Sequence, residues 1–513
     1  MMKSAQGYIF KDLVLIGGGH SHVAVLKSFG MKPIPGVRLT LIARDVQTPY
    51  SGMLPGYVAG HYSFDETHID LRPLCQFASS RLYHDEAVRI DTVNKQVICA
   101  NRPPVSYDLL SINIGSRPEI ASVPGALEFS IPVKPISRFF SRWHQLSERV
   151  LKNNGPHQIA VVGAGAAGVE ILLAIQFRFQ ELLELHQHKT EHLEFHLISN
   201  TDRIMPAFPA GVARRFERIL SQRSVQVHCG AEVIRVYNGG LELNNGKQLS
   251  LDEILWATGA SAPTWPGESE IDVDDAGFIT VNDNLQSTSH ADIFAAGDIV
   301  HVINYPRPKA GVFAVRQGKP LTHNLRRTLL NLPLKKFAPQ KLPLALISTG
   351  DKYVIASKAQ WHFEGAKLWL WKDWIDRRWM LKYTDLPEMS DDENTRIDHR
   401  LADQQALKEI STNTMRCGGC GAKVGANVLS RVISELNPAP RDDILIGLHE
   451  SEDAAVVEVP PGKVMVHTVD YFRSFIDDPY IFGQVAAHHS LSDIFAMGAE
   501  PRSALAIATL PFG

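Results

Sequence analysis

Short apolar runs alternate with longer amphipathic stretches from Asp12 to about Asp385. This alternation is typical of βαβ units that build parallel sheets. The apolar runs at 13–16 and 158–162 each lead into a cluster of glycines. The pattern therefore predicts an α/β fold in which two glycine-rich turns follow two buried strands.

The pattern changes after residue 386. Residues 387–414 are rich in charged side chains and contain no glycine or aromatic residue, which predicts a polar linker with one solvated helix at about 401–410. A new apolar pattern runs from Cys417 to the last residue, and it predicts strands at 464–466 and 504–508.

Composition narrows the class of protein. The 513 residues make about three domains. The formal charge of −3 argues against nucleic acid as a partner and leaves small-molecule substrates. Five cysteines form no disulfide framework, no apolar run is long enough to span a membrane, and the first strand begins too early for a signal peptide. These features predict a cytoplasmic protein.

The first glycine turn has the order that a pyrophosphate site needs, which is strand, glycines and helix start. Gly17 would make the tight turn and Gly19 would let backbone N–H groups approach the phosphates, but His22 stands where a third glycine is usual. Alone, this turn fits a glycine-rich loop without a ligand equally well. After the next apolar run only Asp45 is placed to hold a ribose hydroxyl.

The second turn contains the complete G-x-G-x-x-G pattern at Gly163, Gly165 and Gly168. Two such turns in one chain indicate dinucleotide binding. No acid follows the next strand, where Ser199 stands with Arg203 nearby. This favours either the 2′-phosphate of NADPH or weak nicotinamide binding.

Three further segments carry a family resemblance: residues 114–118, residues 257–263 and the apolar strand 292–296 closed by Gly297 and Asp298. With the two turns, they resemble the pyridine nucleotide-disulfide oxidoreductase superfamily over about residues 10 to 385. Residues 48–56 and 309–318 look like its type II NADH dehydrogenase and sulfide:quinone oxidoreductase branch. The resemblance implies that FAD lies on the first turn, NAD(P)H on the second, and a helix start near the isoalloxazine ring. The cofactor-binding residues it implies are Gly17, Gly19, Asp45, Gly115, Gly163, Gly165, Gly168, Gly259, Gly297, Asp298 and Gly311.

The chain departs from the disulfide reductases because no close cysteine pair precedes Cys417. Electrons are expected to leave the flavin directly for an acceptor, and the earlier cysteines (Cys75, Cys99 and Cys229) to be small buried side chains. Residues 365–379 place five apolar side chains on one helical stripe: Leu368, Trp371, Trp374, Ile375 and Trp379. This stripe fits a membrane-surface helix, but aspartates interrupt its basic flank and favour packing on the flavin domain or a partner subunit.

A cysteine-lysine loop opens the last segment, with Cys420 and Lys423 among glycines. No second C-x-x-C pattern follows that would complete a zinc site. A neighbouring ammonium lowers a thiol pKa and can also meet a phosphate. Three aspartates at the edges of apolar runs, Asp453, Asp470 and Asp493, suit Mg²⁺ bound to nucleotide phosphates.

The motifs of residues 415–513 and their order resemble the N-terminal part of selenophosphate synthetase (selenide, water dikinase), which has an AIR synthetase-like fold. The resemblance implies Cys420 as the catalytic thiol, Lys423 as its partner, the three aspartates as ligands of Mg²⁺ and ATP, and a homodimer. The family's domain is longer than this segment, so we expect the synthetase part to be incomplete here.

The expected fold is thus α/β, with two Rossmann-like domains followed by a partial α+β AIR synthetase-like domain. Expected divisions are a first FAD-binding part (1–128), an NAD(P)H-binding domain (129–284), a second FAD-binding part (285–335), the C-terminal region of the reductase (336–386), the linker (387–414) and the synthetase part (415–513). The expected function is an FAD-dependent NAD(P)H oxidoreductase fused to selenide, water dikinase. The alternatives are a quinone or sulfide:quinone reductase, peripheral at the inner face of the membrane, and a flavin-binding redox sensor.

Overall fold

The computed structural model describes residues 9–120, 122–152, 156–187, 192–340, 343–388, 400–401, 433, 436, 441–448 and 454–508. The chain divides into two compact units, Met1–Leu401 and Ala402–Pro511. Each is described by itself.

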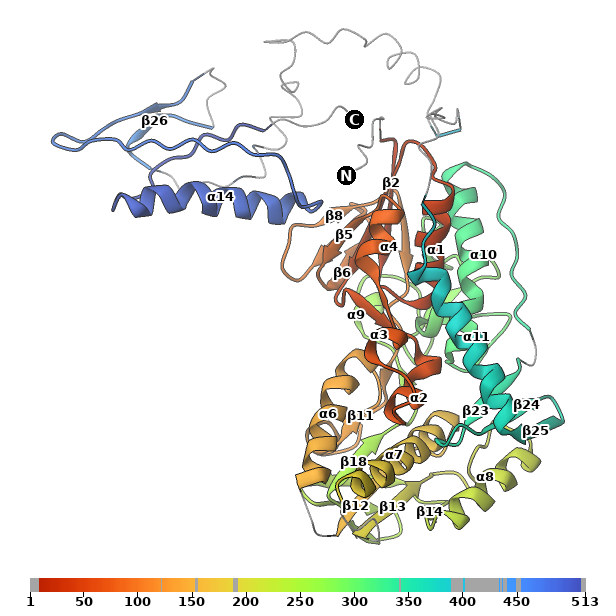
Figure 1. Ribbon diagram of the computed structural model, residues 1–513. Coiled ribbons are helices and arrows are strands. Elements are labelled where there is room, and N and C mark those ends of the chain that lie inside the picture. Colours follow the sequence, from red (N-terminus) through yellow and green to blue (C-terminus); the bar gives the residue numbers. More distant parts are fainter. Residues whose placement is uncertain are drawn as a thin grey trace. The chain divides into compact units, whose positions relative to one another are not determined.

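The first unit contains a five-stranded parallel sheet in the order β21-β9-β1-β2-β5, of which Figure 1 labels β2 and β5. Its strands are β1 (Lys11–Ile16), β2 (Val37–Ala43), β5 (Arg81–His84), β9 (Leu109–Ile112) and β21 (Ile293–Ala295). Leu13 pairs in register with Leu39 on one side and Leu109 on the other. Because both faces of such a sheet are covered, the central strand is apolar throughout its buried part. Helices α1 (His20–Met31) and α10 (Gly311–Leu329) lie against each other beside this sheet.

A second parallel sheet repeats this plan in the order β11-β18-β12-β13-β14. Its strands are β11 (Ile131–Pro132), β12 (His157–Val162), β13 (Leu193–Ile198), β14 (Gln226–His228) and β18 (Glu253–Trp256), and its helices are α6 (Ile136–Lys152), α7 (Ala166–Leu185) and α8 (Ala210–Gln222). The sheets support separate hydrophobic cores. The predicted pair of Rossmann-like domains is therefore confirmed.

Smaller elements complete the unit. Three antiparallel sheets are formed by β6 (Ala87–Asp91), β7 (Gln96–Cys99) and β8 (Val105–Ser106), by β15 (Val233–Tyr237), β16 (Gly240–Leu243) and β17 (Gln248–Ser250), and by β23 (Ala345–Ser348), β24 (Val354–Lys358) and β25 (Trp361–Gly365). Two-stranded pairs are β3 (Gln47–Pro49) with β4 (His68–Asp70), β10 (Arg117–Pro118) with β19 (Ala260–Ser261), and β20 (Ile279–Val281) with β22 (Val300–Val302). Short helices are η1 (Ser51–Met53), α2 (Leu54–Val58), α3 (Phe64–Thr67), α4 (Leu71–Phe77), α5 (Ala126–Phe129), α9 (Trp265–Glu268) and η3 (Gly297–Ile299).

The tryptophan-rich segment forms helix α11 (Ala366–Thr384), but its buried face is not the predicted stripe. Trp379 is buried in the hydrophobic core around the first parallel sheet, whereas Trp371 and Trp374 are exposed. The buried face is formed by Asp376, Trp379, Met380 and Tyr383. The stripe was wrong because Asp376 is buried against a lysine one turn earlier, a pairing that apolar periodicity does not show.

Two further features differ from expectation: part of the predicted linker after α11 is buried, and Cys229 is exposed. Leu401, inside the predicted linker, is 6% exposed and packs in the first core, where Asn331 donates a hydrogen bond to the carbonyl of Arg400. Cys75 and Cys99 are buried as expected, but Cys229 is exposed.

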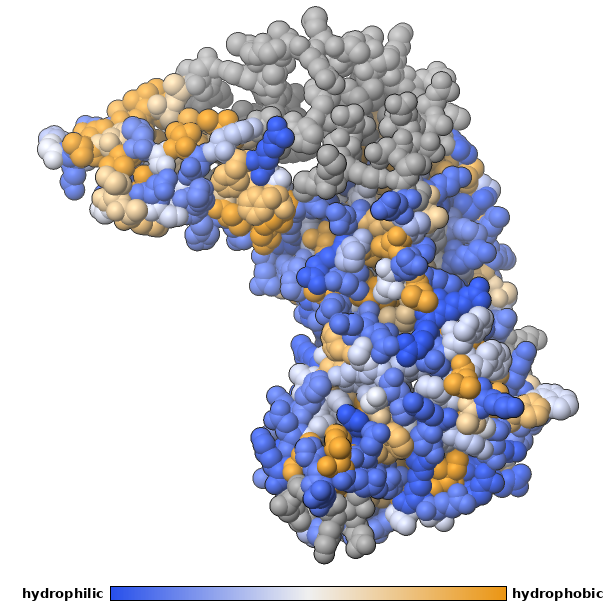
Figure 2. Space-filling model, viewed as in Figure 1, coloured by the Kyte–Doolittle hydropathy of each residue, from blue (hydrophilic) through white to orange (hydrophobic). Residues whose placement is uncertain are grey.

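The second unit contains a two-stranded pair, β26 (Ile444–Ile446) with β27 (Val456–Val457), and helix α14 (Pro479–Ala496). Asp478 caps this helix by accepting from the N–H of Tyr480, and Pro479 fits its first turn. The strands predicted at 464–466 and 504–508 are wrong, since these residues pair with no neighbouring strand. Val464 and Leu505 are 88% and 85% exposed, and apolar side chains cover much of this unit's visible surface (Figure 2). Of the helices the structure describes, none has the length and apolar character needed to cross a membrane.

Candidate functional site

A cavity of about 2170 Å³ lies in the first unit and is bordered by both glycine turns. A typical small-molecule pocket has about 300–1,000 Å³, so this one has room for more than one ligand. The predicted cofactor residues that line it are Gly17, Gly19, Asp45, Gly115, Gly165, Asp298 and Gly311. Gly163, Gly168, Gly259 and Gly297 are not among its lining residues.

The first turn is held by protein atoms on its inner side. Gly17 has a φ of +89°, and a Cβ on Gly19 would lie 2.3 Å from Oδ1 of Asn113. That oxygen accepts hydrogen bonds from the N–H groups of Ser21 and His22, at 3.1 and 3.3 Å. Asn113 comes directly after β9, and no sequence motif marks it, because the N–H groups that it accepts from lie more than 90 positions earlier in the chain.

The second turn uses its glycines differently. A Cβ on Gly168 would lie 1.7 Å from the carbonyl oxygen of Gly163, so only glycine fits there. A Cβ on Gly165 would meet no protein atom within 4 Å, although this residue borders the cavity. Packing therefore explains Gly168, whereas the space beside Gly165 lies open to a ligand.

Asp298 lies in η3, which follows β21, and its carboxylate pairs with the ammonium of Lys134 at 2.8 Å. Before it, Gly297 has a φ of +82° and donates its N–H to Oε1 of Gln317 on α10 at 2.6 Å. Asn113 donates to the carbonyl of Ala296 at 2.6 Å. One buried amide thus connects the first glycine turn to the loop that holds Asp298.

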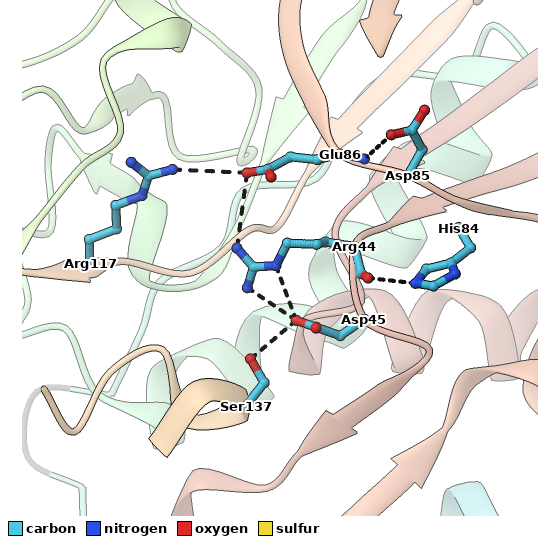
Figure 3. A network of polar contacts seen from close by, with 7 residues as sticks. All are labelled: Arg44, Asp45, His84, Asp85, Glu86, Arg117 and Ser137. Atoms are coloured by element: carbon cyan, nitrogen blue, oxygen red, sulfur yellow. Dashed lines mark hydrogen bonds and ion pairs between the residues drawn. The ribbon is translucent and has the colours of Figure 1, made fainter. Parts of the chain in front are cut away.

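Asp45 takes part in a network of charges at the carboxyl end of β2 (Figure 3). Its carboxylate accepts from Arg44 at 3.1 Å and from the Ser137 hydroxyl at 3.2 Å. Glu86 stands on the other side of the Arg44 guanidinium at 4.0 Å and 3.9 Å from Arg117. Both carboxylates border the cavity, so Glu86 is a second candidate acceptor for hydroxyl groups.

Arg203, in the segment after β13, was expected near the 2′-phosphate of NADPH, but its guanidinium contacts backbone carbonyls. Its guanidinium donates to the carbonyls of Pro206 and Phe208 at 2.9 and 3.0 Å. Ser199 and Thr201 share a hydrogen bond of 2.8 Å between their hydroxyls. The preference between NADH and NADPH stays a prediction.

A buried charge cluster that no sequence motif predicted lies at the cavity wall. Lys372 and Asp376, one turn apart on α11, pair at 2.6 Å with side chains 12% and 7% exposed. Lys372 also donates to the carbonyl of Gly52 at 2.8 Å. Glu170 on α7 accepts from the N–H of Ser348 at 2.7 Å, and burial raises its pKa to about 7, opposed by Lys372. The available signal was that Glu170 stands two positions after Gly168, the last glycine of the second pattern.

Aromatic side chains stand beside this cluster. The rings of Tyr50 and Trp379 stack with centroids 4.2 Å apart, and His20 approaches both at 5.5 and 5.4 Å. Burial raises the pKa of Tyr50, which shares a hydrogen bond with Asp376, and burial also raises the pKa of Asp376. For His20, burial lowers the pKa to about 4, so the imidazole is neutral at pH 7.

The remaining glycines have distinct surroundings. A Cβ on Gly115 would meet no atom within 4 Å, at a φ of +75°. A Cβ on Gly259 would lie 2.6 Å from the Glu119 carboxylate, and one on Gly311 would lie 2.5 Å from the Ser51 hydroxyl.

In the second unit, Cys420, Lys423 and Asp453 lie outside the described residues. Asp493 on α14 accepts from the Thr468 hydroxyl at 2.7 Å, and Asp470 lies 3.9 Å from His489 on the same helix. Two predicted ligands therefore share one neighbourhood. Within the described part of the chain, no three histidine, cysteine, aspartate or glutamate side chains form a group suited to a metal ion.

Two protein families match the sequence. Residues 11–318 match the pyridine nucleotide-disulphide oxidoreductase family, and residues 451–512 match the N-terminal domain of the AIR synthase related protein family.

Individual proteins are similar to different parts of the chain. A selenide, water dikinase from Nitratidesulfovibrio vulgaris (strain DP4) is 44% identical over 102 residues, which are 20% of this chain and 29% of that protein's length. The NADH dehydrogenase-like protein YutJ from Bacillus subtilis (strain 168) is 27% identical over 354 residues, 67% of this chain and 91% of that protein. The solved sulfide:quinone oxidoreductase from Aquifex aeolicus superposes with a TM-score of 0.62 at 16% identity, over 81% of this chain and 99% of the other. At that identity the likeness shows the fold.

Proposed function

Because the chain belongs to the pyridine nucleotide-disulphide oxidoreductase family, joined to a selenophosphate synthetase-like region, we propose that its first unit is an FAD-dependent NAD(P)H oxidoreductase. The observation that carries the proposal is the single cavity bordered by both glycine turns. We assign FAD to the parts at 1–128 and 285–335, and NAD(P)H to 129–284. The flavin would accept a hydride from the nicotinamide and pass two electrons to an acceptor.

The residues present fit a dinucleotide at each turn. Gly115 and Gly165 border the cavity, and a Cβ on either would project into open space. At Gly165 no positive φ or close protein contact requires a glycine, so the lack of a side chain serves the approach of a ligand. The start of α7 adds the positive end of a helix dipole, which suits a pyrophosphate.

The charged residues around the cavity have complementary tasks in this proposal. Asp298, paired with Lys134 at 2.8 Å, would accept hydrogen bonds from hydroxyl groups of FAD. Asp45 or Glu86 would do the same for a ribose. Glu170, whose pKa lies near 7, can bind and release a proton at neutral pH. A group of this kind is needed where reduction of an acceptor consumes protons.

For the second unit we propose a part in selenide, water dikinase chemistry, the formation of selenophosphate, AMP and phosphate from ATP, selenide and water. The chain spans 29% of the length of the selenide, water dikinases from Nitratidesulfovibrio vulgaris to which it is similar. Cys420 would be the reactive thiol beside Lys423, with Asp453, Asp470 and Asp493 holding Mg²⁺ and ATP. Joining the two activities would raise the local concentration of a reduced selenium species. A homodimer belongs to the same proposal.

The first experiment is an anaerobic visible spectrum of the purified full chain, before and after adding NADH and then NADPH. We expect the bound flavin band to bleach with one or both nucleotides. A band that neither nucleotide bleaches would favour a redox sensor, and no band would refute the flavoprotein assignment. Gly165→Ala should weaken reduction by the nucleotide without loss of flavin, whereas Gly483→Ala, another open glycine outside the cavity, should change neither.

A second candidate function is quinone reduction at a membrane surface. The observation that favours it is that α11 borders the cavity with Lys372 and Asp376 but exposes Leu370, Trp371 and Trp374. Flotation with liposomes and turnover of a soluble quinone would support it. If the protein neither floats with liposomes nor turns over quinone, this candidate function is refuted, and a selenium species is the electron acceptor to test next.

A further inference from the structure

His22 takes the place of the third glycine in the first turn, and its side chain is fully buried. Its Nδ1 lies 2.6 Å from the carbonyl oxygen of Gly17, and its Nε2 lies 2.9 Å from the hydroxyl of Ser111 on β9. A carbonyl oxygen only accepts, so Nδ1 carries the hydrogen, and in the neutral ring Nε2 then accepts from the serine hydroxyl. The two contacts define one neutral tautomer. Burial agrees with this state, since it lowers the pKa of His22 to about 4.

The second turn of the same chain provides the comparison. There the carbonyl of Gly163, the first glycine, lies 1.7 Å from where a Cβ on Gly168 would be, so helix and turn approach as closely as backbones allow. In the first turn the equivalent carbonyl, that of Gly17, meets an imidazole instead. The second turn thus relies on close packing against a glycine that has no side chain, whereas the first turn has a hydrogen bond from His22 at the same place.

This bond acts on the part of the turn that must keep its shape. Gly17 has a φ of +89°, and its N–H donates to the carbonyl of Ile42 at 2.8 Å. Its carbonyl is held by His22 from the other side. Ser111 in turn belongs to a strand paired with β1, so the imidazole ties the turn to the rigid sheet.

We propose that His22 is a positioning residue, which through Gly17 and Ser111 holds the first glycine turn in the conformation that binds the FAD pyrophosphate. The inference rests on the proposed FAD binding. It converts an apparent defect of the glycine pattern into a built part of the site.

The first test needs no cofactor. Histidine-selective ¹⁵N NMR of the full-length apo-protein, with the His22→Gln spectrum to assign the signal, reports which ring nitrogen carries the proton. We expect the Nδ1–H tautomer and no titration between pH 8 and 5.5. An Nε2–H tautomer, or titration near pH 6.5, would overturn the proposal.

The second test measures FAD affinity by quenching of flavin fluorescence. His22→Gly restores the usual glycine pattern, yet we expect it to weaken FAD binding about tenfold, because the Gly17 carbonyl and the Ser111 hydroxyl lose a buried partner. Added imidazole should recover the affinity, whereas pyrrole, which fills the same space but offers no acceptor, should not. His290→Gly, in a surface loop, is the control. FAD affinity equal to or better than wild type in folded His22→Gly would overturn the proposal.

Ser111→Ala covers the case in which His22→Gly does not fold. It removes only the hydrogen bond to Nε2, so the Gly17 carbonyl still keeps the hydrogen on Nδ1, and we expect weaker FAD binding with the same tautomer. Unchanged FAD affinity in this variant would overturn the proposal. If the wild-type protein binds no FAD, the proposed function fails, while the tautomer measurement still decides whether His22 holds the turn.

Discussion

Glu170 offers the sharpest test of the electrostatics of the site, through the single change Glu170→Gln. Its carboxyl borders the cavity, accepts one backbone N–H from Ser348 and lies near the cation of Lys372. Glutamine keeps the shape and the acceptor but removes the charge. We therefore expect the variant to be more stable than the wild-type apo-protein above neutral pH.

The size of the effect follows from the pKa. Burial moves the pKa of Glu170 from 4.5 to about 7. At about 1.4 kcal/mol per pH unit, keeping this group ionised costs the folded state about 3 kcal/mol, and water in the cavity would reduce this to about 2 kcal/mol. The folded-state pKa lies above the unfolded value, so the folded protein binds more protons between pH 4.5 and 7. The wild type therefore loses stability as pH rises through that window, and the variant does not.

The assay is urea unfolding of the apo-protein at pH 5, 6, 7 and 8, followed by tryptophan fluorescence. All eight tryptophans lie between residues 143 and 379, so the signal reports the first unit alone. We expect little difference between variant and wild type at pH 5 and a gain of about 2–3 kcal/mol at pH 8. Glu181→Gln, on the exposed side of α7, is the matched control and should stay within about 0.5 kcal/mol. A gain that is absent, or equal at every pH, would refute the reasoning.

Three further outcomes follow from the same site. Lys372→Met strands the buried carboxylate of Asp376 and should destabilise the first unit by about 3 kcal/mol, and adding Asp376→Asn should recover much of the loss in the same urea assay. Gly318→Val should destabilise by about 1–3 kcal/mol and release flavin on gel filtration, because a Cβ there would lie 2.7 Å from that of Ala24 and push α10 away from α1; a stable, yellow variant would contradict this close packing. His20→Gln should remove part of the loss of stability in acid. Burial lowers the pKa of His20 to about 4, so its contribution to stability is complete above pH 6.5 and is lost as pH falls toward 4. Thermal unfolding midpoints at pH 7 and 5 measure whether the variant loses less stability than the wild type.

The parts of the fold that the sequence could predict are those fixed by local pattern. Both glycine turns follow buried strands because a turn between a strand and a helix leaves a compact signature of glycines and apolar residues. The loop that ends in Asp298 was found in the same way.

The parts that could not be predicted depend on contacts between distant residues. Glu170 and Lys372 come from helices 200 positions apart, and His22 meets Ser111 across 89 positions. The stripe on α11 failed because a buried ion pair replaced apolar packing on one side of the helix. The strands expected at 464–466 and 504–508 failed because a strand forms only beside a hydrogen-bonding neighbour, which an apolar run cannot guarantee.

The different surroundings of Gly19 and Gly165 also predict different residence times for the nucleotides bound at the two turns. Gly19 lies directly against the buried amide of Asn113, and Gly165 faces open space. A preorganised, rigid binding site slows dissociation of its ligand, whereas an open site lets its ligand dissociate within a catalytic cycle. We expect the first turn to retain its nucleotide through purification and the second to exchange its nucleotide at every turnover, so that one fold repeated twice separates a resident cofactor from a visiting one by residence time.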